Sequence, residues 1–110
     1  MKLTNEERKA IYRRDGFACA LCGSGKYLQV HHYIKRSNGG SNSPHNLVTL
    51  CSVCHAEVHG IDAFDAPDKP TQEEMEQMVV EYLADMYAPT WNPWEKGTWM
   101  HDAMGGVQGG

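Results

Sequence analysis

The spacing of hydrophobic and polar positions predicts a helix and then a strand in the first third of the chain. Residues 4–7, Thr-Asn-Glu-Glu, form the pattern of a helix capping box, and a short helix is expected to follow through Arg14. Asp15-Gly16 is a typical helix end. Positions 27–31 alternate enough between apolar and polar residues to predict a short strand.

A second strand and a short helix are predicted further along the chain. Residues 38–44 are rich in turn formers and predict a loop, and residues 46–50 predict the strand that follows it. From Cys51 a short helix is expected to run to Gly60, which occupies the position of a C-terminal glycine cap. The predicted fold class is therefore small α+β, with the order strand, long loop, strand and helix.

The second half of the chain predicts one longer amphipathic helix. Residues 70–74 contain a second capping box, and apolar residues then recur at helical spacing through Tyr87. This stripe predicts a packing face against the small core or against a second copy of the chain, that is, a homodimer through residues 72–87. We expect a core at 1–66, this helix within 67–88, and a mobile Trp- and Gly-rich tail at 89–110.

The four cysteines of the chain predict a metal site. They form two Cys-x-x-Cys pairs, which is the pattern of a zinc site rather than of a secreted disulfide scaffold. Four thiolates make a closed tetrahedral site, so we predict a structural zinc that stabilises the fold and takes no part in catalysis. The predicted ligands are Cys19, Cys22, Cys51 and Cys54.

Four of the six histidines lie close to the cysteine pairs and predict a second metal site. His55 and His59 are one helical turn apart, so one helix could supply two ligands to the same ion. Such a pair is as often a pair of ordinary surface histidines. The strand after the first cysteine pair brings His31 and His32 as further donors, which favours a metal between strand and helix.

The charge distribution permits a nucleic-acid partner without showing one. The net charge is -4 at pH 7, but residues 1–36 hold eight Lys or Arg against three Asp or Glu, and residues 37–110 hold two against eleven. A basic half beside an acidic half is compatible with a local phosphate-binding surface, although a solvated helix followed by an acidic tail explains it nearly as well. No signal segment or membrane span is evident, so we expect a cytoplasmic protein.

Taken together, the motifs over about residues 8–60 resemble the HNH nuclease family. The resemblance rests on His31-His32-Tyr-Ile, Gly39-Gly40 and the run from Asn46 through Cys51-x-x-Cys54-His55. It implies a ββα-metal fold and a metal-dependent endonuclease that nicks or cuts double-stranded DNA to 5′-phosphate and 3′-hydroxyl ends. The second ion would be Mg²⁺, Mn²⁺, Ni²⁺ or Zn²⁺.

The resemblance also implies a role for each site residue. His32 corresponds to the general base, His31 and His55 to ligands of the catalytic ion, and His59 to an additional ligand found in colicin-type DNases. Asn46 corresponds to the central Asn, which holds the loop of the general base or, in some members, reaches the metal. An ordinary turn asparagine is the competing interpretation.

Other parts of the hypothesis concern binding. Arg13, Arg14, Lys35 and Arg36 are the candidate DNA contacts, and a solvated loop is the alternative for the last two. Adjacent residues of a regular strand face opposite sides, so His31 and His32 can share one cleft only if a bulge or a strand end intervenes, which predicts irregular backbone at 31–33. In size the chain resembles small phage HNH proteins, which implies a phage terminase or other guiding protein as partner.

The chief rival is a non-catalytic zinc module that binds DNA or a protein. It explains the cysteines and the basic half of the chain, but it gives no reason for the four placed histidines.

Overall fold

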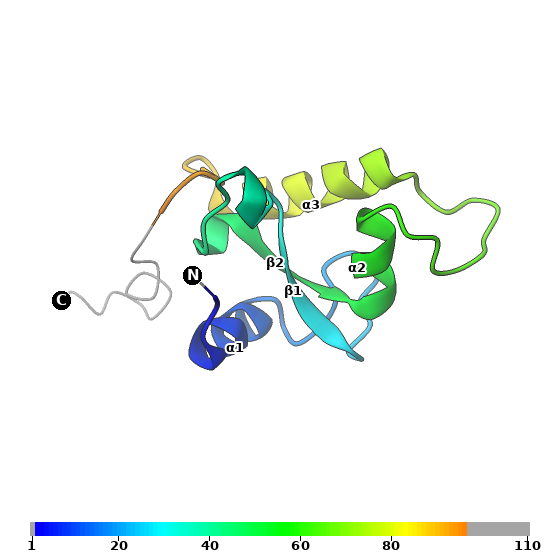
Figure 1. Cartoon of the computed structure of the whole chain (residues 1–110), viewed down its shortest axis with the longest axis horizontal. Helices are drawn as coiled ribbons and strands as arrows, with labels where there is room; N and C mark the ends of the chain where they lie inside the picture. Colours follow the sequence, from blue (N-terminus) through cyan, green and yellow to red (C-terminus); the bar gives the residue numbers. More distant parts are fainter. Residues whose placement is uncertain (1, 97–110) are drawn as a thin grey trace.

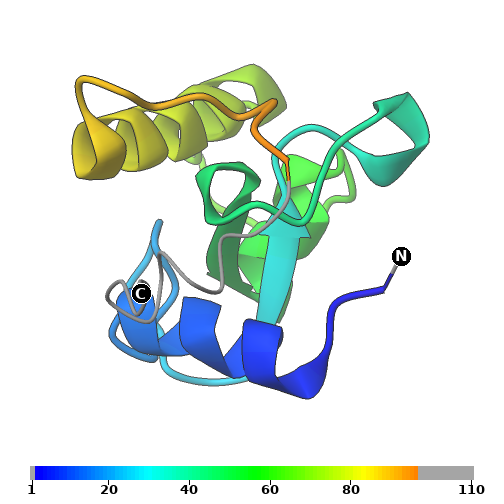
Figure 2. The ribbon, with the colours of Figure 1, turned by 90° about the vertical axis from the view of Figure 1, so that its left-hand side faces the viewer.

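The computed structural model describes residues 2–96 and contains a two-stranded sheet with helices on both sides. Figures 1 and 2 both place the hairpin between α1 and α3, with α2 beside it. The predicted small α+β fold is confirmed. In chain order the elements are α1 (Asn5–Arg14), β1 (Leu28–His32), η1 (Arg36–Asn38), η2 (Pro44–Asn46), β2 (Leu47–Cys51), α2 (Ser52–Val58) and α3 (Gln72–Tyr87).

Both predicted capping boxes are present. At α1 the Thr4 hydroxyl accepts from the Glu7 amide at 3.1 Å, and the Glu7 carboxylate accepts from the Thr4 amide at 2.9 Å. Thr71 and Glu74 make the same reciprocal pair at α3. These bonds satisfy amides that would otherwise have no partner in the first turn, which fixes where each helix begins.

The strands form an antiparallel hairpin whose ends differ by one residue from the prediction. Its register runs from Leu28 opposite Cys51 to His32 opposite Leu47. Tyr27 has a φ of 53°, in the left-handed region, and therefore does not extend β1. Asn46 ends the short η2 turn, so β2 begins one residue later than expected.

Strand β2 lies in the interior, with all five residues buried. Val48 and Leu50 belong to the main core beneath α2 and α3, and Leu47 packs with Ile11 of α1 in a smaller core. Successive side chains of a strand point to opposite faces. The single strand β2 thus joins both helical layers, and β1 forms the edge beside it.

The apolar stripe of α3 covers this core. Met75, Val79 and Leu83 are at most 3% exposed and belong to the same cluster as Val48 and Leu50. Of the two packing partners left open above, the chain's own core is the one observed. The buried stripe therefore gives no support to a homodimer through residues 72–87.

The guanidinium of Arg14 ties α1 to the rest of the molecule. It makes an ion pair with Asp15 through two hydrogen bonds of 2.8 and 2.9 Å, and three more bonds reach distant segments. The three acceptors are the carbonyls of Pro44 and Leu47 and the hydroxyl of Tyr87. A guanidinium has five N–H groups, so each one has a partner inside the protein. The structure therefore leaves Arg14 no unused donor for a phosphate and gives no support to its predicted DNA contact.

The carboxylate of Asp15 completes this junction. Its side chain is fully buried, and it also accepts from the Thr49 amide at 2.9 Å and the Tyr82 hydroxyl at 2.7 Å. Burial and the neighbouring carboxylate raise the pKa of Tyr82, so its hydroxyl keeps its proton and donates. Asp15, which the sequence marked only as a helix end, connects α1, β2 and α3.

The start of the predicted tail is bonded to the core. Trp91 donates to the carbonyl of His45 at 2.8 Å, the Asn92 amide donates to the His45 ring at 2.9 Å, and Ser43 donates to the Glu95 carboxylate at 2.8 Å. The His45 ring also stacks on the Tyr87 ring, with 4.2 Å between the ring centroids. These bonds do not fit a mobile tail at 89–96, and the rest of that prediction, 97–110, lies outside the described residues.

Within residues 2–96, no helix has both the length and the apolar composition needed to cross a bilayer.

Candidate metal centre and active site

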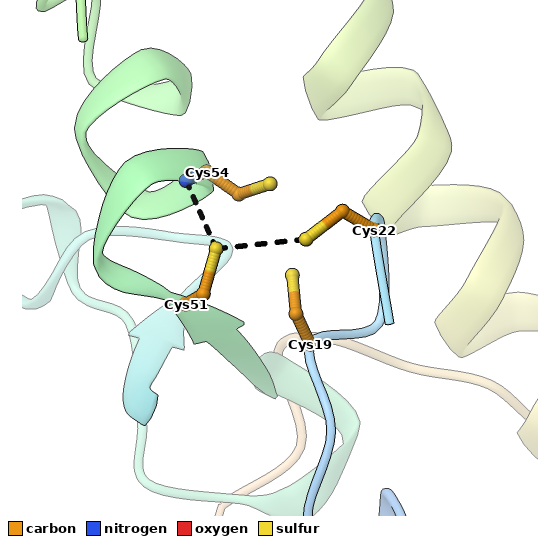
Figure 3. Close-up of side chains that lie close together, drawn as sticks. All are labelled: Cys19, Cys22, Cys51 and Cys54. Atoms are coloured by element: carbon orange, nitrogen blue, oxygen red, sulfur yellow. Dashed lines mark hydrogen bonds between the residues drawn. The ribbon is translucent and has the colours of Figure 1, made fainter. Parts of the chain in front are cut away.

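The four cysteines form one compact cluster. All are free thiols, and their sulfur atoms lie within 4.8 Å of one another. Figure 3 shows the sulfurs pointing toward a common centre, one pair from the loop after α1 and the other from the junction of β2 and α2. The Cys22 and Cys51 sulfurs are 3.6 Å apart, close to the ~3.8 Å separation of thiolates about ~2.3 Å from a tetrahedral ion. The donor set fits a metal.

Local structure around the cysteines prepares them for a cation. The Cys51 sulfur caps α2 by accepting from the Cys54 amide at 3.4 Å. Burial opposes ionisation of Cys19, but backbone donors, first that of Cys51, outweigh burial and lower its pKa. Burial and the charge of Cys19 raise the pKa of Cys54. The thiols thus cannot all ionise unless a positive ion compensates their charge.

Three histidines form a second cluster beside the hairpin. His31 of β1 meets His55 within α2 and His59 directly after it, and one nitrogen from each ring lies within 4.8 Å of the others. The Nε2 atoms of His55 and His59 are 3.1 Å apart. Burial, followed by the effect of the neighbouring rings, lowers the pKa of His31 to about 3. A neutral imidazole is the form that binds a metal, so this donor set also fits a cation.

Gln29 orients one of these rings. Its side-chain oxygen hydrogen-bonds the Nδ1 of His55, which leaves the Nε2 of that ring facing the cluster. A carboxamide oxygen can only accept, so Nδ1 carries the proton and Nε2 keeps its lone pair. Gln29 and His31 are two residues apart on β1 and therefore point to the same face. No sequence pattern predicts this role, because it depends on how α2 lies across β1.

His32 lies on the rim of the same depression. A surface depression of about 260 Å³ is lined by His31, His32, Lys35, Arg36, His55, His59 and Val30. The pairing of β1 is regular through His32 and the bend begins at Tyr33, so a strand end rather than a bulge lies within residues 31–33. Both rings nevertheless reach one depression, because His32 is the last residue of the strand.

Asn42 fixes the orientation of the His32 ring. Its side-chain oxygen lies 2.8 Å from the Nε2 of His32, so Nε2 carries the proton and Nδ1 has the free lone pair. Burial lowers the pKa of His32, and the charges of Arg36 and Arg8 act in the same direction. No sequence pattern singles out Asn42. Only the fold of the loop shows that it contacts the ring.

Asn46 is fully buried and bonds to the backbone of the loop that follows His32. Its side-chain oxygen accepts from the Ile34 amide at 2.7 Å, and its side-chain nitrogen donates to the carbonyls of Ile34 at 3.1 Å and Ser41 at 2.9 Å. Gly40 permits this closure, since a Cβ there would lie 1.8 Å from the Ile34 carbonyl oxygen. The side chain thus joins the two ends of the loop.

Comparison with known proteins agrees with this geometry. The family model described as HNH endonuclease matches residues 19–60, which include every cysteine and histidine of the two clusters. The chain belongs to the HNH endonuclease family. The hairpin, α2 and the clustered cysteines are consistent with the ββα-metal core that the resemblance implied.

Two curated relatives share parts of this HNH segment. The chain is 52% identical over 33 residues to "Type IV methyl-directed restriction enzyme EcoKMcrA" of Escherichia coli (strain K12), which is 30% of this chain but 12% of that protein. It is 34% identical over 58 residues to "Anaredoxin" of Nostoc sp. (strain PCC 7120 / SAG 25.82 / UTEX 2576), 49% of this chain and 76% of that protein. No solved structure matches significantly.

The basic residues predicted to contact DNA occupy different environments. Lys35 and Arg36 are exposed and line the depression. Arg13 is exposed on α1. Arg14, by contrast, is committed to the Asp15 junction. The HNH site is therefore flanked by Lys35 and Arg36, two cations of the loop that Asn46 joins, and neither makes an ion pair with any of residues 2–96.

Proposed function

We propose that this protein is a metal-dependent endonuclease that hydrolyses phosphodiester bonds of double-stranded DNA, leaving 5′-phosphate and 3′-hydroxyl ends. The observation that supports this most is the depression in which the three-histidine cluster, the His32 ring and two basic side chains meet. Family membership supports nuclease chemistry, and one relative is named a restriction enzyme.

The two clusters have separate duties in this proposal. Cys19, Cys22, Cys51 and Cys54 would hold a structural Zn²⁺, which tetrahedral thiolates favour. His31, His55 and His59 would hold a divalent ion, Mg²⁺, Mn²⁺, Ni²⁺ or Zn²⁺. When bound, that ion supplies charge stabilisation at the scissile phosphate and at the leaving oxygen.

The chain's own residues carry the remaining steps. The Nδ1 of His32 takes the proton from the attacking water, because Asn42 occupies its Nε2. Lys35 and Arg36 bind phosphate oxygens beside the depression. Asn46 positions this loop through the backbone of Ile34, and within residues 2–96 its side-chain hydrogen bonds reach only Ile34 and Ser41, not the histidine cluster.

The experiment is a nicking assay on supercoiled plasmid with Mg²⁺, Mn²⁺, Ni²⁺ or Zn²⁺ added in turn. We expect cleavage with at least one ion and a loss of about 10²–10⁴-fold in His32→Ala at unchanged zinc content. Tyr27→Ala, at the other end of β1, is the matched control and should cut like the wild type. Absence of cleavage with every ion would favour the non-catalytic zinc module.

The biological setting is a further part of the proposal. A phage terminase or another guiding protein would supply the sequence choice, because the sequence predicts no groove-reading helix beyond the HNH core. Purified protein that cuts random plasmid sites would support this division of labour. A fixed cleavage pattern from the chain alone would contradict it.

A further inference from the structure

A second cavity lies next to the cleavage depression. Its volume is about 520 Å³, within the range of ~300–1,000 Å³ typical of small-ligand sites. Three segments far apart in the sequence build it: the loop after β1, the helix α3 and the stretch at 91–94. Its aromatic walls are Tyr33, Trp91 and Trp94.

The aromatic rings are arranged as an open platform. Tyr33 and Trp91 lie 6.1 Å apart with their planes inclined by 47°, and Trp91 is anchored by its bond to His45. Trp94 is 56% exposed and rests over Gly39, whose Cβ, if present, would be 3.8 Å from the indole. An indole left this exposed beside a rigid ring can stack on a planar ligand.

Polar groups around the platform are available to a ligand. The side chains of Glu76 and Asn38 line the cavity, and neither makes a side-chain hydrogen bond or ion pair with any residue in the described range 2–96. Lys35 lines both this cavity and the histidine depression. A ligand that filled the cavity would therefore continue toward the proposed cleavage site past one cation.

We infer that this cavity binds an unpaired nucleobase of the DNA strand being cut, one that carries an exocyclic amino group. This inference rests on the proposed function and adds a feature of its substrate. The base stacks on Trp94, and Lys35 binds the phosphate between this base and the scissile bond. A carboxylate repels phosphate but accepts from a base amino group, so Glu76 contacts the base edge.

The composition of the cavity favours this occupant over an apolar protein segment. A nonpolar partner would leave the carboxylate of Glu76 and the ammonium of Lys35 desolvated without partners, which is costly. A nucleotide instead offers each of them a complementary group, a donor for Glu76 and an anion for Lys35.

Binding of short single strands tests the inference without depending on cleavage. Fluorescently labelled oligodeoxycytidine and oligothymidine of about 12 nucleotides are titrated with the full chain, with no divalent ion added. We expect tighter binding of the cytosine strand, whose base carries the amino group. Trp94→Ala should weaken binding of both strands about tenfold, and Trp94→Phe should retain most of it.

The matched variants separate stacking, base recognition and net charge. Glu76→Ala should abolish the preference for cytosine over thymine. Glu73→Ala removes the same charge from an exposed site on α3 and should keep the preference, and Tyr27→Ala removes an exposed ring elsewhere and should keep the affinity. Unchanged binding in Trp94→Ala, or unchanged preference in Glu76→Ala, would overturn the inference, as would failure to bind either strand.

The plasmid assay distinguishes this outcome from failure of the proposed function. If the protein nicks plasmid but Trp94→Ala binds single strands like the wild type, the nuclease proposal stands and the proposed base site is wrong. Binding that depends on Trp94 in a chain that never cleaves would support the base site and remove the nuclease proposal.

Discussion

The cysteine cluster and the histidine cluster are built from residues close together in the sequence, yet they differ in how open they are to the surface. Three of the four cysteines are buried, and the four sulfurs point toward a common centre (Figure 3). The histidines open into a depression with His32, Lys35 and Arg36 around it. A site closed by its own ligands can only stabilise the fold, whereas a site that opens to a depression can also take a substrate.

Arg14 and Arg36 show that residue type alone does not determine the role of a side chain. Arg14 donates its five hydrogen bonds within the chain, and Arg36 is exposed beside the depression. We call the cysteine cluster with the Arg14–Asp15 pair the frame. We call the depression with its histidines and cations the open site.

Removal of the ion from the cysteine cluster should have the largest effect. This small core is built around that cluster, so a strong chelator should abolish the cooperative thermal transition followed by circular dichroism, and zinc should restore it. Cys51→Ser, which loses both a ligand and the α2 cap, should behave like the chelated protein. If the chelated protein still melted cooperatively at an unchanged temperature, the cysteine cluster would not be what stabilises the fold.

Breaking the Arg14–Asp15 pair of the frame should lower the free energy of unfolding without altering the cysteine or the histidine cluster. Arg14→Met leaves the buried Asp15 carboxylate without its counter-charge, and we expect a loss of about 3–5 kcal/mol in the free energy of unfolding. Arg36→Met is the matched control. It should leave stability unchanged while weakening DNA binding and reducing its salt dependence. Equal stability in the two variants would contradict the assignment of Arg14.

The open site should lose activity while the fold persists. His55→Ala removes one of the three imidazoles, so we expect at least a hundredfold loss of cleavage at low metal concentration. Substituting a residue that only hydrogen-bonds to a metal ligand typically costs about 10–100-fold. Added metal should restore part of the activity because the fold and the other donors remain. Cys51→Ser should show no such rescue, and a His55→Ala protein that fails to fold would contradict the separation of duties.

The sequence predicts the features that depend on neighbours along the chain. The capping boxes at Thr4 and Thr71 and the Cys-x-x-Cys pairs are local patterns, and the structure contains them. His55 and His59 share a face because they are one helical turn apart. The order of the core elements also follows from local signals, and the strand ends differ by one residue.

The features that the sequence does not predict join segments distant in the chain. Arg14 meets Tyr87 across 73 positions, and His45 is covered by a segment expected to be mobile. A side chain's partners over such separations depend on helix packing, which no local period encodes. The charge distribution therefore favours Arg14 as a DNA contact, although the structure shows that its donors are already used inside the fold.

The smallest expected effect concerns Gln29, which belongs to neither cluster but orients a ring of the open one. Gln29→Leu keeps the size of the side chain and removes the acceptor that fixes the Nδ1 proton of His55. We expect divalent metal to bind about 10–100-fold more weakly, with an unchanged melting temperature because Gln29 is exposed. Titration of the open site by calorimetry measures this.

Gln77→Leu, at an exposed position of α3, controls for the added apolar surface and should bind metal normally. Gln29→Glu provides the complementary test, since a carboxylate also accepts from Nδ1 and should preserve or strengthen metal binding. If Gln29→Leu bound metal like the wild type, the orientation of His55 would be set by α2 alone. The open site would then resemble the cysteine cluster in needing no support beyond its own ligands.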